Sequence, residues 1–266
     1  MRKEVLKEPT FEKEIAVMIR VSKSMDEMRE QLRAYHDNDI AQSLKYLNRA
    51  ERNLLYSGLD AKWLAEIMSY VDDPAPYIEE IGIDKLAEII NEMEADDAVD
   101  LWEDIDESVK VKLRPMLDDE KTMDILLINS YDEDEIGSLI TTNYIRIKQN
   151  LSIRQAMHEL VQQAGENDNI TTLYVVDDRG RFCGAIDLKD LIVARENVAL
   201  DSLISYAYPY LLDHEKISDS IEKIKDYAED SLPVLNKDKK IIGIITAQDV
   251  VEAVDDELGE DYAKLA

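Results

Sequence analysis

Carboxylates dominate the last part of the chain, and they are the residues best able to do chemistry there. Between Asp249 and Asp261 there are seven acidic side chains and no basic one. Asp249, Glu252 and Asp256 have spacings that place them along one side of a helix, and Glu260 extends the row. Such a row either holds a hard divalent cation, which prefers oxygen ligands, or is a solvated helix face.

A second acidic region lies in the first half of the chain. Residues 72–137 contain 23 acidic and five basic side chains. Within this region Asp96 and Asp100 are four residues apart, which places both on one helix face, one turn apart. Two remote acidic segments can form two walls of one cation site, but the sequence alone does not show that they meet. A solvated face is the other interpretation.

Composition excludes several functions. The chain has 266 residues, 59 acidic against 31 basic, and a formal net charge of −28. Such a chain should repel nucleic acid, which needs a basic footprint, and should attract cations. A single cysteine, Cys183, excludes an intrachain disulfide and fits a reducing compartment. No apolar run reaches about 18 residues, so the chain is expected to be soluble and intracellular.

Catalytic motifs are also missing from the sequence. There is no glycine-rich phosphate loop, no nucleophile elbow and no Cys/His pair close in sequence. The three histidines, His36, His158 and His214, lack the spacing of a zinc site. We therefore expect a binding or regulatory protein and not an enzyme.

The elements that must position these carboxylates change character along the chain. Residues 10–136 predict helix after helix, because apolar residues recur at helical spacing and LAEIM (64–68) returns as LAEII (86–90). Breaks are expected near Gly58, Pro74 and Gly82. Short amphipathic helices cannot bury their faces alone, so they should stack into a small superhelix.

Beyond residue 136 the sequence contains an internal repeat. TLYVVDDRGRFCGAIDLKDL (172–191) aligns with SLPVLNKDKKIIGIITAQDV (231–250) at an offset of 59. Upstream, residues 138–160 align with 202–224 at an offset of 64. Each copy predicts a short strand, a helix, a strand, a turn, a strand and a helix. Two such copies suggest a pseudo-symmetric pair that packs sheet to sheet.

The two copies resemble cystathionine-β-synthase (CBS) modules. The whole order, EADDAVDLWEDI, then YDEDEIGSLI, then two CBS modules, then DELGED, resembles the cytosolic region of the MgtE family of magnesium channels and transporters. The resemblance implies an α+β multidomain fold, with an N-terminal all-α superhelical domain followed by a tandem pair of α/β CBS modules. The expected parts are a helical extension (1–38), the acidic MgtE N domain (39–136), CBS module 1 (137–200), CBS module 2 (201–262) and the start of a linker (263–266).

The resemblance also implies a function. In that family a membrane-spanning domain follows the DELGED segment, so the chain looks like a regulatory fragment at the cytoplasmic face of the cell membrane. It should form a homodimer through its CBS modules, and Mg²⁺ should close the helical domain onto the CBS dimer by bridging carboxylates. The implied magnesium ligands are Asp96, Asp100, Ser138, Asp249, Glu252, Glu257 and Glu260. Ser138 stands where a glycine is usual and would serve through its carbonyl. Ala228 replaces another metal-binding Asp, which Glu229 or Asp230 would have to substitute.

A second ligand competes with magnesium. CBS pairs often bind ATP or another adenine nucleotide, and GIITAQD (243–249) fits the family pattern, with Thr246 and Asp249 facing a ribose. The first copy has Asp187 in place of Thr246, so one complete nucleotide site is expected. In the alternative interpretation the glycine makes a tight turn and Thr or Asp caps the next helix. An adenine-nucleotide-sensing CBS protein and a helical scaffold without a small ligand both remain open.

Overall fold

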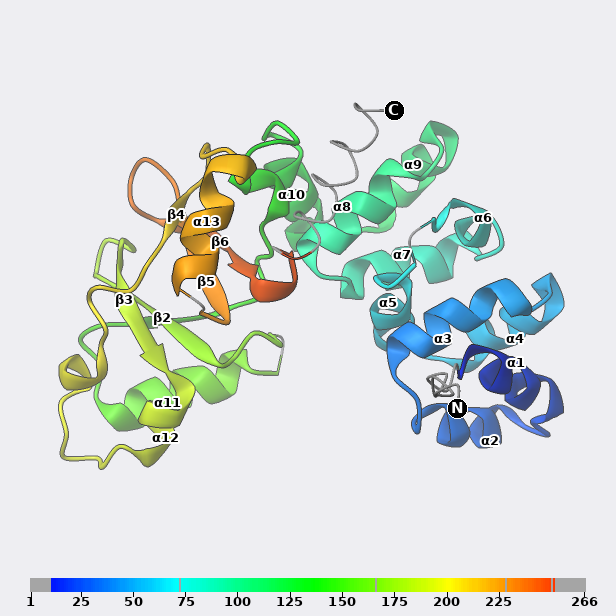
Figure 1. Cartoon of the computed structure of the whole chain (residues 1–266), viewed down its shortest axis with the longest axis horizontal. Helices are drawn as coiled ribbons and strands as arrows, with labels where there is room; N and C mark the ends of the chain where they lie inside the picture. The colour runs from blue at the N-terminus through cyan, green and yellow to red at the C-terminus, as the bar shows by residue number, and fades with distance from the viewer. Residues whose placement is uncertain (1–10, 72, 166, 228, 250, 252–266) are drawn as a thin grey trace, which may run out of the picture. The chain divides into compact units, whose positions relative to one another are not determined.

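The chain contains two compact units. The computed structural model describes residues 11–71, 73–165, 167–227, 229–249 and 251. The first unit comprises Met1–Met93 and Asp97–Thr122, and the second comprises Glu94–Asp96 and Met123–Ala266. Short helices build the first unit, whereas the second contains two small sheets with helices beside them (Figure 1).

The helical unit follows the predicted pattern of short helices. Its elements are α1 (Glu12–Val21), α2 (Met25–Leu32), α3 (Asp37–Ser43), the 3₁₀ turn η1 (Leu44–Tyr46), α4 (Arg49–Gly58), α5 (Ala61–Met68), α6 (Ala75–Ile78), α7 (Ile83–Glu92), α8 (Ala95–Glu103), α9 (Glu107–Leu113), η2 (Arg114–Met116) and α10 (Asp119–Ile128). The division between the two units falls within α8 and α10.

Side-chain caps explain where many of these helices begin. The side chains of Ser24, Asp60 and Asp106 each accept a hydrogen bond from a first-turn amide of α2, α5 and α9. Asn48 and Glu51 form a reciprocal capping box at α4. Each cap gives a hydrogen-bond partner to an amide that the helix itself leaves without one. The helices therefore begin directly after these polar residues.

The repeated LAEIM and LAEII segments form the centre of this unit. Leu64 and Ile67 of α5 and Leu86 and Ile90 of α7 are at most 1% exposed, and the two helices pack together. The predicted stacking of amphipathic helices is therefore confirmed. Burial of several branched side chains along one stripe supplies the apolar area that helices this short require.

One partly buried ion pair, between Arg52 and Glu80, joins α4 to the segment after α6. Arg52 binds both carboxylate oxygens of Glu80, at 2.7 and 2.6 Å, and its guanidinium lies over the Tyr77 ring. The hydrogen bonds from Arg52 hold the pKa of Glu80 below its ordinary value. Arg52 also donates to the carbonyl groups of Leu44 and Leu47, so its guanidinium holds η1 in place as well.

The second unit contains two equivalent three-stranded sheets. The first repeat consists of β1 (Ile145–Lys148), α11 (Ile153–Gln163), β2 (Thr172–Val176), β3 (Phe182–Asp187) and α12 (Leu188–Val193). The second repeat consists of β4 (Leu211–Leu212), α13 (Ile217–Tyr227), β5 (Ser231–Leu235) and β6 (Ile241–Thr246). The 3₁₀ turns η3 (Ile136–Leu139) and η4 (Leu200–Leu203) precede the two repeats. In each sheet the first strand runs parallel to the central strand and the last runs antiparallel.

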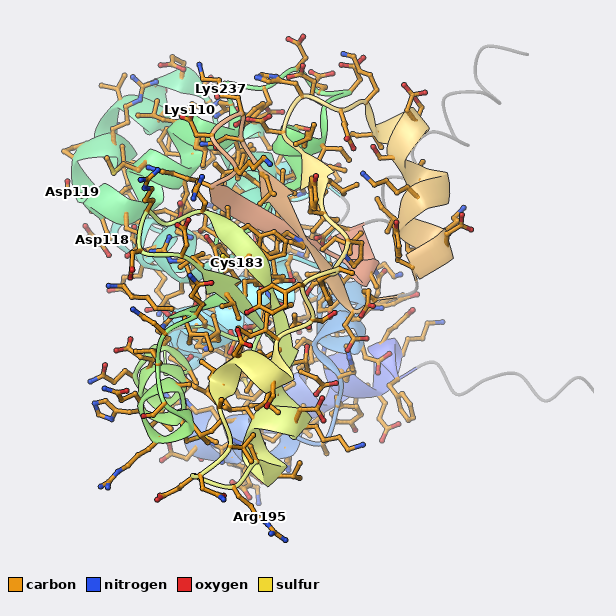
Figure 2. The ribbon with its side chains drawn as sticks, turned by 90° about the vertical axis from the view of Figure 1, so that its left-hand side faces the viewer. Lys110, Asp118, Asp119, Cys183, Arg195 and Lys237 are labelled. Atoms are coloured by element: carbon orange, nitrogen blue, oxygen red, sulfur yellow. The ribbon has the colours of Figure 1, made fainter. Side chains whose placement is uncertain are left out.

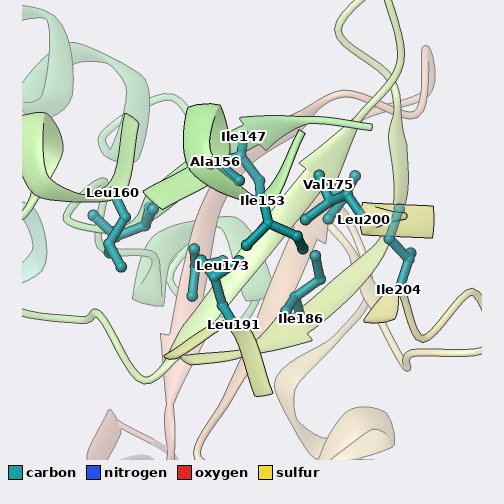
Figure 3. Close-up of a cluster of buried hydrophobic side chains, with 11 residues drawn as sticks. Ile147, Ile153, Ala156, Leu160, Leu173, Val175, Ile186, Leu191, Leu200 and Ile204 are labelled. Carbon is teal, nitrogen blue, oxygen red and sulfur yellow. The ribbon is translucent and has the colours of Figure 1, made fainter. Parts of the chain in front are cut away.

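In the first repeat, helices cover one face of the sheet, and the other face meets the second sheet. In this repeat, Ile147 and Val175 from the sheet pack with Ile153 and Leu160 of α11 and Leu191 of α12 (Figure 3). A second buried cluster draws from both sheets, and its members are Tyr174, Val176, Ala185, Leu235, Ile241 and Ile244. The predicted sheet-to-sheet pair is confirmed.

Gly184 and Gly243 lie inside strands β3 and β6, so the tight turn of the alternative interpretation is wrong. A Cβ atom on Gly184 would lie within 3.0 Å of the Ser205 carbonyl oxygen. One on Gly243 would lie 2.9 Å from the carbonyl oxygen of Thr141. Both glycines therefore let another segment of backbone approach the strand closely.

Those approaching segments cross between the repeats. We call residues 131–144, which precede β1, the first lead-in segment, and residues 195–210, which precede β4, the second. The first bonds to the second repeat through Thr141 and Ile244, and the second bonds to the first repeat through Ala185 and Ser205. Each repeat thus receives backbone from the segment that leads into the other.

Candidate ligand-binding sites

Thr246 and Asp249 are joined to each other at the end of β6. The Thr246 amide and hydroxyl donate to the two carboxylate oxygens of Asp249, at 2.6 and 2.9 Å. The Asp249 amide lies 3.4 Å from the Thr246 hydroxyl oxygen. This reciprocal arrangement is a helix-capping box, which supports the capping interpretation of GIITAQD. The nucleotide role assigned to these two residues stays a prediction.

The corresponding position in the first repeat borders a cavity of about 670 Å³. Asp187 and Asp190, the equivalents of Thr246 and Asp249, both line it. Asp187 caps α12, because its carboxylate accepts a hydrogen bond of 2.7 Å from the Lys189 amide. The cavity volume lies in the range of small-ligand pockets, roughly 300–1,000 Å³. The structure therefore has a ligand-sized cavity in the first repeat, whereas the sequence predicted the complete nucleotide site in the second repeat.

Three different parts of the second unit build this cavity. The first repeat supplies the start of β2, the end of β3 and residues along α12. The second lead-in segment supplies Ser205 and Tyr208, and the chain just before β5 supplies Glu229 and Asp230. Ser205 is held by the exchange of backbone bonds with Ala185, at 3.2 and 2.8 Å. The second lead-in segment therefore forms one side of the cavity because its backbone bonds to β3.

Tyr208 is fixed within that wall. Its hydroxyl donates to the Ser231 carbonyl oxygen at 2.9 Å. Burial raises its pKa well above the ordinary tyrosine value, and the nearby Glu229 carboxylate acts in the same direction. The ring is therefore a neutral, rigid aromatic surface of the kind on which a planar base can stack.

The proposed magnesium ligands within the described residues lie at three places, namely α8, η3 and, for Asp249, the chain just after β6. Asp96 and Asp100 are one turn apart on α8; Asp96 is partly buried and Asp100 is exposed. Ser138 lies in η3, where its hydroxyl donates to the carbonyl groups of Glu133 and Glu135. Glu252, Glu257 and Glu260 lie outside the described residues.

The donor chemistry suits Mg²⁺, since the residues offer carboxylate oxygens and carbonyl groups. Within residues 11–71, 73–165, 167–227, 229–249 and 251, no group of three or more His, Cys, Asp or Glu side chains is arranged to hold a metal ion. The metal roles of Asp96, Asp100, Ser138 and Asp249 therefore stay predictions.

The first lead-in segment forms a hydrogen-bonded junction with the second repeat that sequence reasoning missed. The amides of Ile136 and Gly137 both donate at 2.8 Å to the chain before α13. Asp134 pairs with Lys216 at 2.6 Å, and Glu135 pairs with His214 at 3.1 Å. The acidic run YDEDEIG thus contacts two basic residues, His214 and Lys216, which lie just before α13 in the other repeat. Their presence in the segment before α13 is the sequence signal for this junction.

Tyr131 completes this junction. Its hydroxyl donates to an Asp213 carboxylate oxygen at 3.3 Å, and its ring lies against Gly137, where any Cβ would clash with it. Burial and the Asp213 carboxylate raise the pKa of Tyr131 to about 12. A glycine directly before Ser138 is therefore explained by packing of the Tyr131 ring.

Other reactive side chains serve structural or surface roles. His158 is exposed on α11 and contacts Gln162, and the His36 side chain caps α3. Cys183 lies partly buried on β3, where burial raises its pKa (Figure 2). A thiol with a raised pKa is a weak nucleophile.

Taken together, the fold defines a tandem CBS protein with an all-helical N-terminal domain. The MgtE intracellular N domain family matches residues 35–134, and the CBS domain family matches residues 136–197 and 201–256. By domain content and order, the chain belongs to the MgtE family, as an MgtE N domain joined to a pair of CBS domains.

Individual relatives agree with this assignment. The chain is 30% identical over 262 residues to the magnesium transporter MgtE of Enterococcus faecalis and 26% identical over 243 residues to that of Thermus thermophilus. These alignments cover 96% and 90% of this chain but 58% and 54% of the relatives, so the chain spans a little over half their length. Among the helices that the structure describes, none is both long and apolar enough to cross a bilayer.

Two solved structures are similar over nearly the whole chain. The crystal structure of the soluble part of a magnesium transporter has a TM-score of 0.86 and 28% identity, and the match covers 93% of this chain and 99% of that one. The cytosolic domain of the Mg²⁺ channel MgtE in complex with ATP has a TM-score of 0.81 and 25% identity, covering 90% and 99%.

Proposed function

We propose that this chain is the magnesium-sensing regulatory region of an MgtE-type magnesium transporter. The observation that carries the proposal is the joining of an MgtE N domain to a CBS pair, in a chain with a net charge of −28. Asp96 and Asp100 of α8 offer carboxylate oxygens, the ligand type that Mg²⁺ prefers.

In the proposed mechanism, Mg²⁺ lowers the repulsion between acidic segments of the helical domain and the CBS pair. Asp96 and Asp100 supply carboxylates from α8, Ser138 supplies a carbonyl group, and the acidic C-terminal segment supplies the facing carboxylates. Bound ions bridge these groups and favour a closed arrangement, whereas without ions the like charges favour an open one. A membrane domain attached beyond this chain would respond to that equilibrium.

Isothermal titration calorimetry with Mg²⁺ tests the proposal. The wild-type chain should release or absorb heat saturably, and Asp96→Asn with Asp100→Asn should weaken the apparent affinity at least tenfold. Asp119→Asn, which removes a carboxylate from the first turn of α10, is the matched control and should leave the titration unchanged. An identical titration in the α8 double variant would reject the assignment of these ligands.

We also propose that the CBS pair forms a homodimer through its helices. Val161 of α11 and Ile192 and Val193 of α12 are 68%, 60% and 69% exposed, which is unusual for large apolar side chains so close together in one repeat. Apolar association should be independent of metal. Light scattering should therefore give a dimer both with Mg²⁺ and with a chelator, and a monomer at micromolar concentration would contradict this.

A second candidate function is the binding of an adenine nucleoside or nucleotide in the cavity beside Asp187. The cavity volume and the ATP complex of a similar domain support it. Asp190→Ala should weaken adenosine binding at least tenfold, whereas Thr246→Ala should change it less than twofold. The opposite ranking would favour the sequence-based assignment to Thr246 and Asp249.

A further inference from the structure

The cavity beside Asp187 is strongly acidic. Four carboxylates line it, from Asp187, Asp190, Glu229 and Asp230, whereas Lys189 is the single basic residue among the described lining residues. Phosphate groups are usually bound by Arg or Lys side chains or by free amides at a helix start. Here the Lys189 amide at the start of α12 already donates to Asp187. The cavity therefore offers little to balance a phosphate chain.

The remaining lining suits an uncharged nucleoside. Leu188, Leu203 and the ring of Tyr208 provide apolar surface for a base, and the hydroxyl-bearing side chains of Thr172 and Ser205 provide polar contacts. Carboxylates such as Asp190 accept hydrogen bonds from the two hydroxyl groups of a ribose, which is a common role for an acidic residue in nucleotide sites. The lining thus offers favourable contacts to a base and a ribose, whereas its carboxylates repel the negative charge of phosphate groups.

We infer that this cavity selects its ligand by charge: a purine nucleoside without phosphates binds best, each added phosphate weakens binding, and a divalent cation restores the binding of a nucleoside triphosphate. The inference rests on the proposed nucleoside site and specifies its ligand. Because Asp190, Glu229 and Asp230 are exposed, salt screens their charge, and the discrimination should be largest at low ionic strength.

Calorimetric titrations with adenosine, AMP and ATP test this inference. In low-salt buffer with a chelator, ATP should bind at least tenfold more weakly than adenosine, with AMP between them. With the protein first saturated with Mg²⁺ and the ATP supplied as its magnesium complex, the gap should shrink to threefold or less. ATP that binds as tightly as adenosine in the chelator would overturn the inference and leave the nucleoside site intact.

Charge-neutralising variants sharpen the test. Glu229→Gln with Asp230→Asn should keep adenosine affinity within twofold and bring ATP in chelator to within threefold of adenosine. Asp238→Asn, an exposed carboxylate on the β5–β6 turn outside the cavity, should leave the original gap unchanged. An unaltered gap in the double variant would overturn the inference. Failure of adenosine, AMP and ATP alike to bind would instead reject the proposed nucleoside site itself.

Discussion

The two repeats of the second unit share one backbone plan and differ in their side chains. Their four isolated bridges form two equivalent pairs under the sequence offsets: Glu135–Lys216 with Ser152–Ala199, and Thr141–Ile244 with Ala185–Ser205. Where the first lead-in segment crosses, charged and aromatic side chains reinforce the bridge, whereas small residues occupy the equivalent place in the second. The backbone crossing is therefore common to both repeats, and the reinforcement is specific to one.

The strand ends differ in the same way. After β6, Thr246 and Asp249 bond to each other in a closed cap, whereas after β3, Asp187 caps its helix through Lys189 and Asp190 lines a cavity. At the cap position, the second repeat has the hydroxyl of Thr246 and the first repeat has the carboxylate of Asp187. With Thr246 the last acidic residue of the motif bonds back to the cap, whereas with Asp187 it lines the cavity. The two repeats therefore share the backbone bridges to the lead-in segments, whereas the side chains at the cap positions differ between them.

The largest expected loss of stability comes from substitutions that push the lead-in segments away from strands β3 and β6. Gly184→Ala forces a Cβ against the backbone oxygen of Ser205, so the second unit should lose about 3 kcal/mol of unfolding free energy. Gly243→Ala meets Thr141 and Ile140 at 2.9 and 2.7 Å and should cost slightly less, about 2 kcal/mol. Urea unfolding followed by circular dichroism measures both.

Gly82→Ala is the control for this pair, because a Cβ there meets no atom within 4 Å. It should change stability by less than about 1 kcal/mol. If Gly184→Ala were as well tolerated as Gly82→Ala, the proposed close crossing would be wrong.

The reinforced junction gives the next effect. Tyr131→Ala removes the ring that packs on Gly137 and should destabilise the second unit by about 2 kcal/mol. Tyr131→Phe keeps the ring and loses the hydrogen bond to Asp213, so it should cost about 1 kcal/mol. Equal losses for the two variants in urea unfolding would show that the ring packing contributes nothing.

A smaller effect is expected at the two hairpin turns. Lys239 has a φ of 61°, whereas its equivalent is Gly180, with a φ of 75°. Lys239→Gly should relieve the left-handed strain and, after the entropy cost of glycine, stabilise the protein by about 0.5 kcal/mol. Gly180→Ala should destabilise by about 1 kcal/mol. A destabilising Lys239→Gly would mean that the lysine side chain has a stabilising role in the turn.

The smallest effect concerns pH at the junction. A hydrogen bond from the Asp132 amide and the contact with His214 hold the pKa of Glu135 below its ordinary value. A lowered carboxyl pKa stabilises the folded state above the ordinary glutamate pKa, and this stability is lost as the pH falls through the lowered value. Glu135→Gln should therefore flatten the acid side of the stability profile and leave its shape near pH 7 unchanged. Superimposable acid profiles for wild type and variant would exclude this contribution.

The repeat explains why much of the fold was predictable. Equivalent residues such as Gly184 and Gly243 are visible within one chain, and the turns DDRG and NKDK mark the hairpins at β2–β3 and β5–β6. The cavity was not predictable, because Glu229 and Asp230 come from one repeat and Asp190 from the other. Their proximity depends on a backbone crossing that leaves no local pattern. Similarly, the sequence does not distinguish Thr246 as a helix cap from Thr246 as a ribose contact.

The most direct test of magnesium sensing is small-angle X-ray scattering of the whole chain with a chelator and with millimolar Mg²⁺. The account predicts a larger radius of gyration in the chelator, a smaller one with Mg²⁺, and only partial compaction by about 0.15 M NaCl, which screens charge without bridging it. Asp96→Asn, Asp100→Asn and Glu257→Gln should each make the metal-free form more compact and weaken its response to Mg²⁺. Scattering curves that superimpose with and without Mg²⁺, together with no heat of binding, would contradict the account.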